Sequence, residues 1–269
     1  DYSHDDMQQI AAAVGLSETA FVTRSPLADF KLQFFTPTQQ IAHCGHATVA
    51  TFSYLQQTGR LKKTETSKET IDGLRDIRME GDQAYMEQLA PTYSALSPQI
   101  FADTLDALGV TESDLLDQAP PCVVNTGNSF LVIGLKDADL VKRLEVDQAS
   151  IERISETLDL IGFYVFSLSS QLAGRDAGAR MFAPRYGINE ESATGMAAGP
   201  LACYLYDKLS VHHREFYIEQ GHWMPDSSPS LINVRLTLGD DGRIKRLYAG
   251  GRAEVGEIKC VDLQLQGKN

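Results

Sequence analysis

The sequence predicts an α+β fold made of two similar halves, each with strands wrapped around one central helix. Strand-forming runs follow one another through short turns, which is typical of antiparallel pairing and not of a doubly wound parallel sheet. One strand–loop–helix pattern also occurs twice, at 34–55 and 181–205, which indicates a diverged duplication. The length of 269 residues and the 43% hydrophobic content favour two modest domains with a sizeable core.

The first part of the chain alternates helices and strands. In order, we expect a helix at 6–14, strands at 19–23 and 30–36, a helix at 44–57, and a hairpin with strands at 77–79 and 84–86. The first helix places Met7, Ile10 and Ala11 on one face and ends at Gly15. The second strand alternates as KLQFF and ends before Pro37.

After Pro91 the sequence pattern predicts amphipathic helices with strands between and after them. We expect amphipathic helices at 97–108 and 150–158, a strand pair within 122–135 that turns at 125–128, and strands at 163–168, 179–182, 215–219 and 231–236. The last strand turns at GDDG into RIKRLYAGG. The predicted halves are therefore residues 1–95, with 260–269 as a candidate addition, and residues 96–259.

Both copies of the repeated pattern run from a Phe-x-Pro strand end into a helix that begins at glycine. From Gly45 and Gly195, alanine follows at the second position, and Tyr-Leu follows at the ninth and tenth. Each helix is nearly uncharged, which predicts a buried helix. A helix start built from small residues leaves free N–H groups that a ligand can approach. We therefore predict that two helix starts face one another across a cleft suited to a small acid.

Composition excludes several classes of function. The net charge of −12 and the absence of a Lys/Arg cluster argue against a nucleic-acid or anionic membrane surface. The four cysteines show no C-x-x-C spacing, so free thiols in a reducing compartment are expected. No apolar run is long enough to span a membrane, and the N-terminus does not resemble a signal peptide. We expect a soluble, cytoplasmic protein.

The chain resembles the phenazine-biosynthesis PhzF-like family, which shares the diaminopimelate-epimerase-like fold. The resemblance rests on stretches that lie in order and cover nearly the whole chain: MQQIAAAVGLSETAFV, FFTPTQQIAHCGHATVA, VVNTGNSFLVI, ARMFAPRYGINEESATGMAAGPLA, EQG and a late AGG. It implies two halves, each a barrel-like, mostly antiparallel sheet around a central helix, with the active site between them. It also implies a homodimer.

The resemblance implies an isomerase that moves a proton on a small carboxylic acid without a metal or organic cofactor. The glutamate of the S-E-T motif, here Glu18, is the implied general acid/base. The histidine of the G-H motif, His46, and the acid of the E-D-P-x-T-G motif, Glu191, are implied to support it. We expect backbone amides at the two helix starts to bind the substrate carboxylate, from Gly45 and Ala47 in one half and from Thr194, Gly195 and Ala197 in the other.

The chain departs from the family pattern in three places. Glu190-Glu191-Ser192 replaces Glu-Asp-Pro, and Met196 replaces a small polar residue, which alters the predicted substrate wall. The opening strand of the family, with its Gly-Asn-Pro turn, has no counterpart before Asp1. The first two changes, at residues 190–192 and at Met196, argue against a standard phenazine substrate.

The residue types leave alternatives at the site. A general base needs a pKa raised toward neutrality, and the apolar neighbours Ala20 and Phe21 are compatible with that for Glu18. The stretch HCGH suggests a metal, but His43 and His46 lack a second Cys/His pair at zinc-like spacing, so no metal is expected.

Cys44 stands near the position of a catalytic thiol in related two-cysteine epimerases. Its counterpart falls at Ala193-Thr194, and Cys203 lies too far into the helix, so a packing role is expected for Cys44.

Two other functions stay open from the sequence. One is a two-base racemase or epimerase, with Glu18 and Glu191 on opposite faces of the substrate carbon. The other is a small-molecule-binding member of the family without catalysis, for which the departures at 191, 192 and 196 argue.

Overall fold

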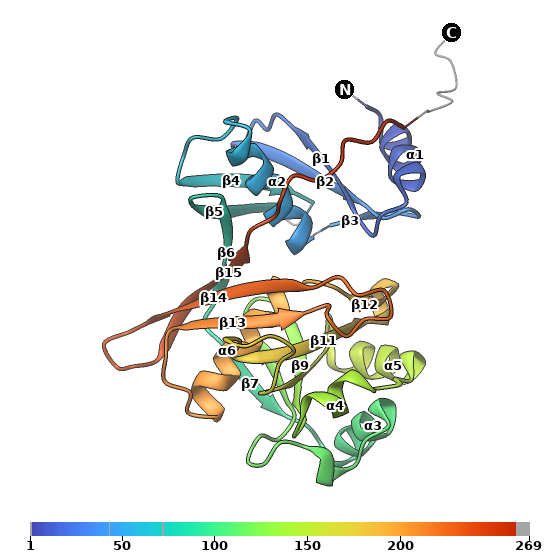
Figure 1. Ribbon diagram of the computed structural model, residues 1–269, viewed down its shortest axis with the longest axis vertical. Coiled ribbons are helices and arrows are strands. Elements are labelled where there is room, and N and C mark those ends of the chain that lie inside the picture. Colours follow the sequence, from blue (N-terminus) through green and yellow to red (C-terminus); the bar gives the residue numbers. More distant parts are fainter. Residues whose placement is uncertain (1, 43, 72, 262–269) are drawn as a thin grey trace. The chain divides into compact units, whose positions relative to one another are not determined.

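The computed structural model describes residues 2–42, 44–71 and 73–261 (Figure 1). His43, weighed above as a metal ligand, and residues 262–269 of the candidate addition to the first half lie outside the described residues. The chain divides into two compact units: Asp1–Glu87 with Gly250–Asn269, called the first unit, and Gln88–Ala249, called the second unit. The chain passes from the first unit to the second within β6 (Gln83–Leu89) and returns within β15 (Ile244–Gly251).

The first unit contains two helices and a twisted sheet. Its elements are α1 His4–Val14, β1 Thr19–Thr23, β2 Phe30–Phe35, β3 Gln40–Ile41, α2 Gly45–Gln57, β4 Glu65–Thr70, β5 Gly73–Glu80 and β6 Gln83–Leu89. The strand order is β1-β2-β4-β5-β6, and β3 pairs with β2. The predicted hairpin is confirmed, because β5 and β6 are antiparallel and Glu80 faces Gln83 across the turn.

Local signals set the ends of α1. Ser3 and Asp6 form a reciprocal capping box at its start, and Gly15 ends it with a φ of 68°. Met7 and Ala11 are buried against Phe35 of β2, as the helical spacing predicted. The helix therefore packs against β1 and β2, at the edge of the sheet.

The strand β4 was not predicted, and its sequence explains why. The segment ETSKET has no apolar residue, yet Thr66, Lys68 and Thr70 are buried on its inward face. Lys68 is fully buried, with Nζ 2.6 Å from Oγ1 of Thr48 and 5.3 Å from the ring centroid of Phe34. The inward face of this strand is polar, so the hydrophobic alternation that marks a strand is missing.

The second unit carries the larger core. Its elements are β7 Thr92–Ala95, α3 Pro98–Leu108, a 3-10 turn Glu112–Asp114, β8 Cys122–Asn125, β9 Ser129–Gly134, α4 Ala138–Lys142, α5 Gln148–Leu158, β10 Gly162–Ser167, β11 Ala177–Ala183, a 3-10 turn Pro184–Tyr186, β12 Ile188–Glu191, α6 Gly195–Lys208, β13 Glu215–Gln220, β14 Ser230–Leu238 and β15 Ile244–Gly251. The order is β15-β14-β13-β11-β10-β9-β8-β7, with β12 paired to β11.

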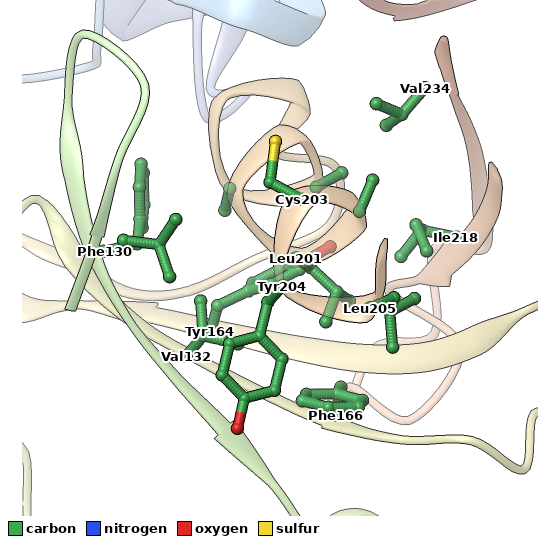
Figure 2. Packing of buried hydrophobic residues seen from close by; sticks show 14 of the residues in the cluster. Phe130, Val132, Tyr164, Phe166, Leu201, Cys203, Tyr204, Leu205, Ile218 and Val234 are labelled. Carbon is green, nitrogen blue, oxygen red and sulfur yellow. The ribbon is translucent and has the colours of Figure 1, made fainter. Parts of the chain in front are cut away.

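The helix α6 is the centre of the second unit. Figure 2 shows Leu201, Cys203, Tyr204 and Leu205 of α6 among side chains of the surrounding strands. The cluster around α6 includes Phe130, Val132, Tyr164, Phe166, Ile218 and Val234. Each buried aromatic or aliphatic side chain contributes about 1.5–3 kcal/mol of transfer free energy. The predicted burial of this helix is confirmed, since residues 197–205 are all buried.

The same strands bury their other face against three amphipathic helices. In β9, Phe130 and Val132 point to α6, whereas Leu131 and Ile133 pack with residues of α3, α4 and α5. This period of two is the direct result of strand geometry. Because both faces are covered, β9 and β10 are continuous apolar runs.

The repeated sequence pattern folds into the same local unit twice. In both copies a strand is followed by a short antiparallel return strand, then by a helix, and then by a strand parallel to the first: β2–β3–α2–β4 and β11–β12–α6–β13. The segments predicted as polar loops thus contain the short strands β3 and β12. The pairing is mostly antiparallel, as predicted, and the parallel pairs β2–β4, β9–β10 and β11–β13 arise where a helix connects the strands.

One expectation about the helices is wrong. α2 was predicted to be buried on all sides, but Ala50, Tyr54 and Gln57 form an exposed stripe at helical spacing. A nearly uncharged helix can keep such a stripe because alanine, tyrosine and glutamine tolerate water. Within the described residues, no helix is both long and apolar enough to cross a bilayer.

Candidate functional site

Glu18 lies directly before β1 and points inward. Its side chain is only 3% exposed, and its Oε2 lies 3.0 Å from Nε2 of His46, whose side chain is 28% exposed. His46 is the second residue of α2. The fold thus brings together the glutamate of S-E-T and the histidine of G-H, which the family resemblance implies to act together.

Two buried oxygens at this position lack a hydrogen-bond donor among the described residues. They are Oε2 of Glu18 and Oγ1 of Thr19. Nε2 of His46 lies at ion-pair distance from this carboxylate, and the two groups form an ion pair when the imidazole is protonated. An unsatisfied buried oxygen costs about 1–3 kcal/mol, and a catalytic role is one of the recognised explanations for such a group.

The electrostatics of Glu18 differ from the expectation of a raised pKa. Burial acts to raise the pKa of this carboxyl, but the close imidazole of His46 and the hydroxyl of Ser17 outweigh it, so the pKa lies below its ordinary value of 4.5. The expectation failed because it rested on the apolar neighbours Ala20 and Phe21, whereas the 3.0 Å distance from Glu18 to His46 is known only from the structure. Glu18 is therefore ionised at neutral pH.

The start of α2 surrounds this pair. Cys44 is the N-cap residue but makes no side-chain cap, and its Sγ lies 3.7 Å from Nδ1 of His46. The hydroxyl of Thr48 donates to the Cys44 carbonyl at 2.6 Å and accepts from Lys68. This chain of hydrogen bonds fixes the first turn of α2, which carries Gly45 and Ala47.

The same group offers donor atoms for a metal. Glu18, Cys44 and His46 present a carboxylate, a thiol and an imidazole within 4.8 Å of one another. Such donors suit Zn²⁺. The direct pairing of Glu18 with His46 is equally the arrangement of a carboxylate supported by an imidazole, which needs no ion.

The second group of predicted residues lies at the start of α6, in the second unit. Glu191 ends β12 and is buried, and its Oε1 accepts the N–H of Ser192 at 2.8 Å and the Ser192 hydroxyl at 3.3 Å. The neighbouring Glu190 points the other way and forms a double hydrogen bond with Arg180, at 2.7 Å for each oxygen. Alternation along β12 thus gives the two glutamates different partners.

Some of the backbone N–H groups at the start of α6 already have a hydrogen-bond acceptor. The N–H of Thr194 donates to Gln220 and the N–H of Ala197 donates to the Thr194 carbonyl. Within the part of the chain that the structure describes, the N–H groups of Gly195 and Met196 have no hydrogen-bond acceptor. Met196 also receives a contact at its Sδ from Nδ2 of Asn128, at 3.4 Å.

Neither helix-start glycine is required by packing. A Cβ at Gly45 would meet only Met86, at 3.5 Å, and one at Gly195 would meet only Ala249, at 3.8 Å. Both are ordinary contacts, and neither residue has a positive φ. Open space beside a backbone without Cβ is what close ligand approach needs.

Sequence reasoning missed the side chain that holds the α6 start. Gln220 is 1% exposed and contacts residues 191 and 194, whereas its stretch EQG was noted above only as part of the resemblance. It also missed Gln88, whose Nε2 donates to the Gly195 carbonyl at 2.9 Å. Neither Gln220 nor Gln88 belongs to a hydrophobic periodicity that would mark it in the sequence. The signal available in the sequence was a glutamine just after a predicted strand.

Comparisons with known proteins identify the family and relatives of this chain. A family model described as phenazine biosynthesis-like protein (PhzC-PhzF) matches residues 1–257. An uncharacterized isomerase of Clostridium acetobutylicum is 33% identical over 216 residues, which cover 78% of this chain and 70% of that protein. The trans-2,3-dihydro-3-hydroxyanthranilate isomerase of Pseudomonas chlororaphis is 31% identical over 211 residues, covering 76% and 70%.

A solved structure shows the same fold. The Bacillus anthracis phenazine biosynthesis protein of the PhzF family matches with a TM-score of 0.82 at 24% identity, over 93% of this chain and 86% of that chain. The predicted α+β fold is thereby confirmed.

Proposed function

The chain belongs to the phenazine biosynthesis-like PhzC-PhzF family, and we propose that it is an isomerase that moves a proton on a small carboxylic acid, with Glu18 as the general acid/base and no cofactor. The observation that carries this proposal is the buried Glu18 carboxylate, with Oε2 lacking a hydrogen-bond donor and lying 3.0 Å from the His46 imidazole. The isomerase names of the relatives support the reaction class.

The proposed proton transfer needs only the Glu18 carboxyl and the His46 imidazole. The ionised Glu18 takes a proton from a substrate carbon, and the electron pair left behind is delocalised into the adjacent unsaturated system of the acid. The protonated carboxyl, whose proton can exchange with solvent while the intermediate is bound, then protonates another carbon, so the net reaction is an isomerisation that can carry solvent deuterium into the product. His46 supports the carboxylate while it is ionised, and its charge contact weakens when Glu18 carries the proton.

A low pKa would make Glu18 a weak base in the free protein. Entry of an apolar or anionic substrate changes that balance, because both excluded water and a second negative charge raise the pKa of a carboxyl. The substrate carboxylate itself suits the free N–H groups at the α6 start. Its proposed location in a cleft between the two helix starts stays a prediction.

The environment of Glu191 favours a one-base mechanism over a two-base racemase. Oε1 of Glu191 is engaged by Ser192, so this carboxylate stabilises its own turn. A second general base should instead keep its oxygens available for the substrate. We therefore assign Glu191 a supporting role.

The test is solvent deuterium exchange in Glu18→Gln. The probe is trans-2,3-dihydro-3-hydroxyanthranilate, named for the Pseudomonas relative, followed by other small unsaturated cyclic acids. With an acid that the wild type labels, we expect exchange to fall at least about 100-fold in Glu18→Gln, the usual contribution of general acid–base catalysis. Glu65→Gln, on the exposed start of β4, is the matched control and should exchange normally.

Three outcomes separate the alternatives. Full exchange in folded Glu18→Gln contradicts the proposal. Products of both configurations from one enantiomer identify a racemase. A tightly bound acid that the wild type neither exchanges nor converts identifies a binding protein.

A further inference from the structure

We propose that Gln220 is a positioning residue whose side-chain amide clamps the turn at residues 191–194 and so sets the direction of the free N–H groups at the start of α6. This deepens the proposed function and rests on it for its catalytic consequence. The clamp itself is a local structural relationship that can be measured without any substrate.

The side chain of Gln220 makes a complete set of hydrogen bonds. Nε2 donates to the Glu191 carbonyl at 2.7 Å and to Oγ1 of Thr194 at 3.0 Å. Oε1 accepts the Thr194 N–H at 3.1 Å and the Tyr164 hydroxyl at 2.9 Å. An amide has two donor hydrogens and two acceptor lone pairs, so all its capacity is used.

Only an amide of this length fits. The Glu191 carbonyl can only accept and the Thr194 N–H can only donate, which fixes the orientation of the Gln220 amide without ambiguity. Glutamate would place an acceptor against a carbonyl, and an apolar side chain would leave both backbone groups unpaired. Gln220 and Tyr164 are 1% and 0% exposed, so water cannot substitute for the missing bonds.

The three successive residues Glu219, Gln220 and Gly221 each lie against the backbone of a neighbouring loop. The Glu219 carboxylate accepts the N–H groups of Gln171 and Leu172, at 2.9 and 3.1 Å. Gln220 holds residues 191–194. A Cβ at Gly221, which has a φ of +80°, would lie 2.1 Å from the Ser228 carbonyl oxygen and 2.7 Å from that of Ser192. The EQG stretch is therefore explained by three separate backbone contacts.

The Gln220 clamp affects which backbone N–H groups at the start of α6 are available to a ligand. Thr194 is the N-cap residue, but its side chain makes no cap bond to the helix, and its Oγ1 accepts a hydrogen bond from Gln220. An ordinary threonine cap would bond the N–H of the second or third helical residue. Here the N–H groups of Gly195 and Met196 stay available, in a direction fixed by the buried amide.

The first experiment measures amide hydrogen exchange by mass spectrometry on the full chain. In Gln220→Met we expect exchange of residues 191–198 to accelerate about 10- to 100-fold, because three hydrogen bonds to this turn are lost. Peptides covering residues 169–173 should stay unchanged. Glu219→Gln is the matched control, since it alters an adjacent buried residue and should loosen residues 171–172 and not 191–198.

Tyr164→Phe provides a second control. It removes one bond of Gln220 but leaves the three bonds to the turn, so exchange at 191–198 should change little. If Gln220→Met fails to fold, Gln220→Glu, which keeps the shape and loses the donors, replaces it.

The second experiment compares catalysis with stability. Gln220→Met should lower the rate of solvent deuterium incorporation at saturating acid by about 10- to 100-fold, the effect of a small misplacement of a binding group. Glu219→Gln should keep that rate even where it lowers the melting temperature as much. The probe acid is the one that the wild type labels.

The outcomes are distinguishable. Unchanged exchange at 191–198 in Gln220→Met, or equal acceleration throughout the second unit, overturns the clamp. Accelerated local exchange with a wild-type rate overturns the catalytic consequence alone. If no acid is labelled by the wild type, the proposed function fails, while the hydrogen-exchange comparison still decides the clamp.

Discussion

Oε2 of Glu18 lies 3.0 Å from Nε2 of His46, and this contact together with the Ser17 hydroxyl outweighs the effect of burial on the pKa of the carboxyl. Glu18 comes from the segment before β1, and His46 from the first turn of α2. Neither position has an unusual sequence context by itself. Their pairing defines the electrostatic state of the candidate site, and the first two predictions follow from it.

His46→Gln should raise the pKa of Glu18. In the wild type, burial raises that pKa, and His46 with Ser17 lowers it further than burial raises it. Without the imidazole, burial is the dominant remaining influence, so the pKa of Glu18 should move above its ordinary value of 4.5. Carbon-13 NMR titration of the glutamate carboxyls measures this, with Glu18→Gln used to assign the resonance. An unshifted resonance would show that His46 does not control the carboxyl.

The same pair predicts a pH dependence of stability. The folded-state pKa of Glu18 lies below the unfolded value near 4.5, so ionised Glu18 stabilises the fold above that pH. The contribution is lost as the pH falls through the folded-state pKa. Urea unfolding should therefore show that His46→Gln is destabilised more at pH 7 than at pH 3. An equal loss at both pH values would contradict the linkage.

Gly221→Ala should be strongly destabilising. Its φ of +80° strains any L side chain, and the new Cβ would meet two carbonyl oxygens at 2.1 and 2.7 Å. We expect a loss of about 2–5 kcal/mol from backbone strain and overpacking together. Gly242→Ala is the control, because its φ is +76° but no atom lies within 4 Å, so about 1–2 kcal/mol is expected. Chemical denaturation compares them, and equal losses would refute the steric argument.

Arg180→Met should cost about 3–5 kcal/mol, since it leaves the buried Glu190 carboxylate without its partner. Arg180 and Glu190 are 8% and 11% exposed and share two hydrogen bonds of 2.7 Å. Asp159→Asn breaks an exposed pair with Arg185 and should change stability very little, because water screens that pair. Unfolding free energies measure both. A small loss in Arg180→Met would show that water replaces the arginine.

One thiol should react much faster than the other three. Cys260 is exposed, whereas Cys44, Cys122 and Cys203 are buried. Burial raises the pKa of the Cys122 and Cys203 thiols, which further lowers their reactivity. Titration with an aromatic disulfide reagent should give one rapid equivalent in native protein, which Cys260→Ser removes. The remaining thiols should react only on unfolding.

Local signals in the sequence were sufficient for most elements. The strand at 19–23, the hairpin that became β5 and β6, and the turn at 125–128 were predicted because turn residues and alternation act over a few residues. The repeated pattern also located both helix starts at glycine. It worked because duplication keeps the order of residues even where the loops diverge.

Long-range contacts explain what was missed. β4 was overlooked because its inward residues are Thr66, Lys68 and Thr70, and a buried lysine is indistinguishable in sequence from a solvated one. The pKa direction of Glu18 was wrong because His46 arrives from another element. Gln220 was left without a role because its partners lie in a turn that precedes α6.

The sequence by itself determined the family, the fold class and the residues that deserve testing, because motif order and hydrophobic periodicity are written along the chain. The tertiary structure decided which polar groups are partners, which are buried, and which remain unsatisfied. Those properties depend on distances of about 3 Å between residues far apart in sequence. For that reason the lowered pKa of Glu18 and the clamp at Gln220 appear only in the folded chain.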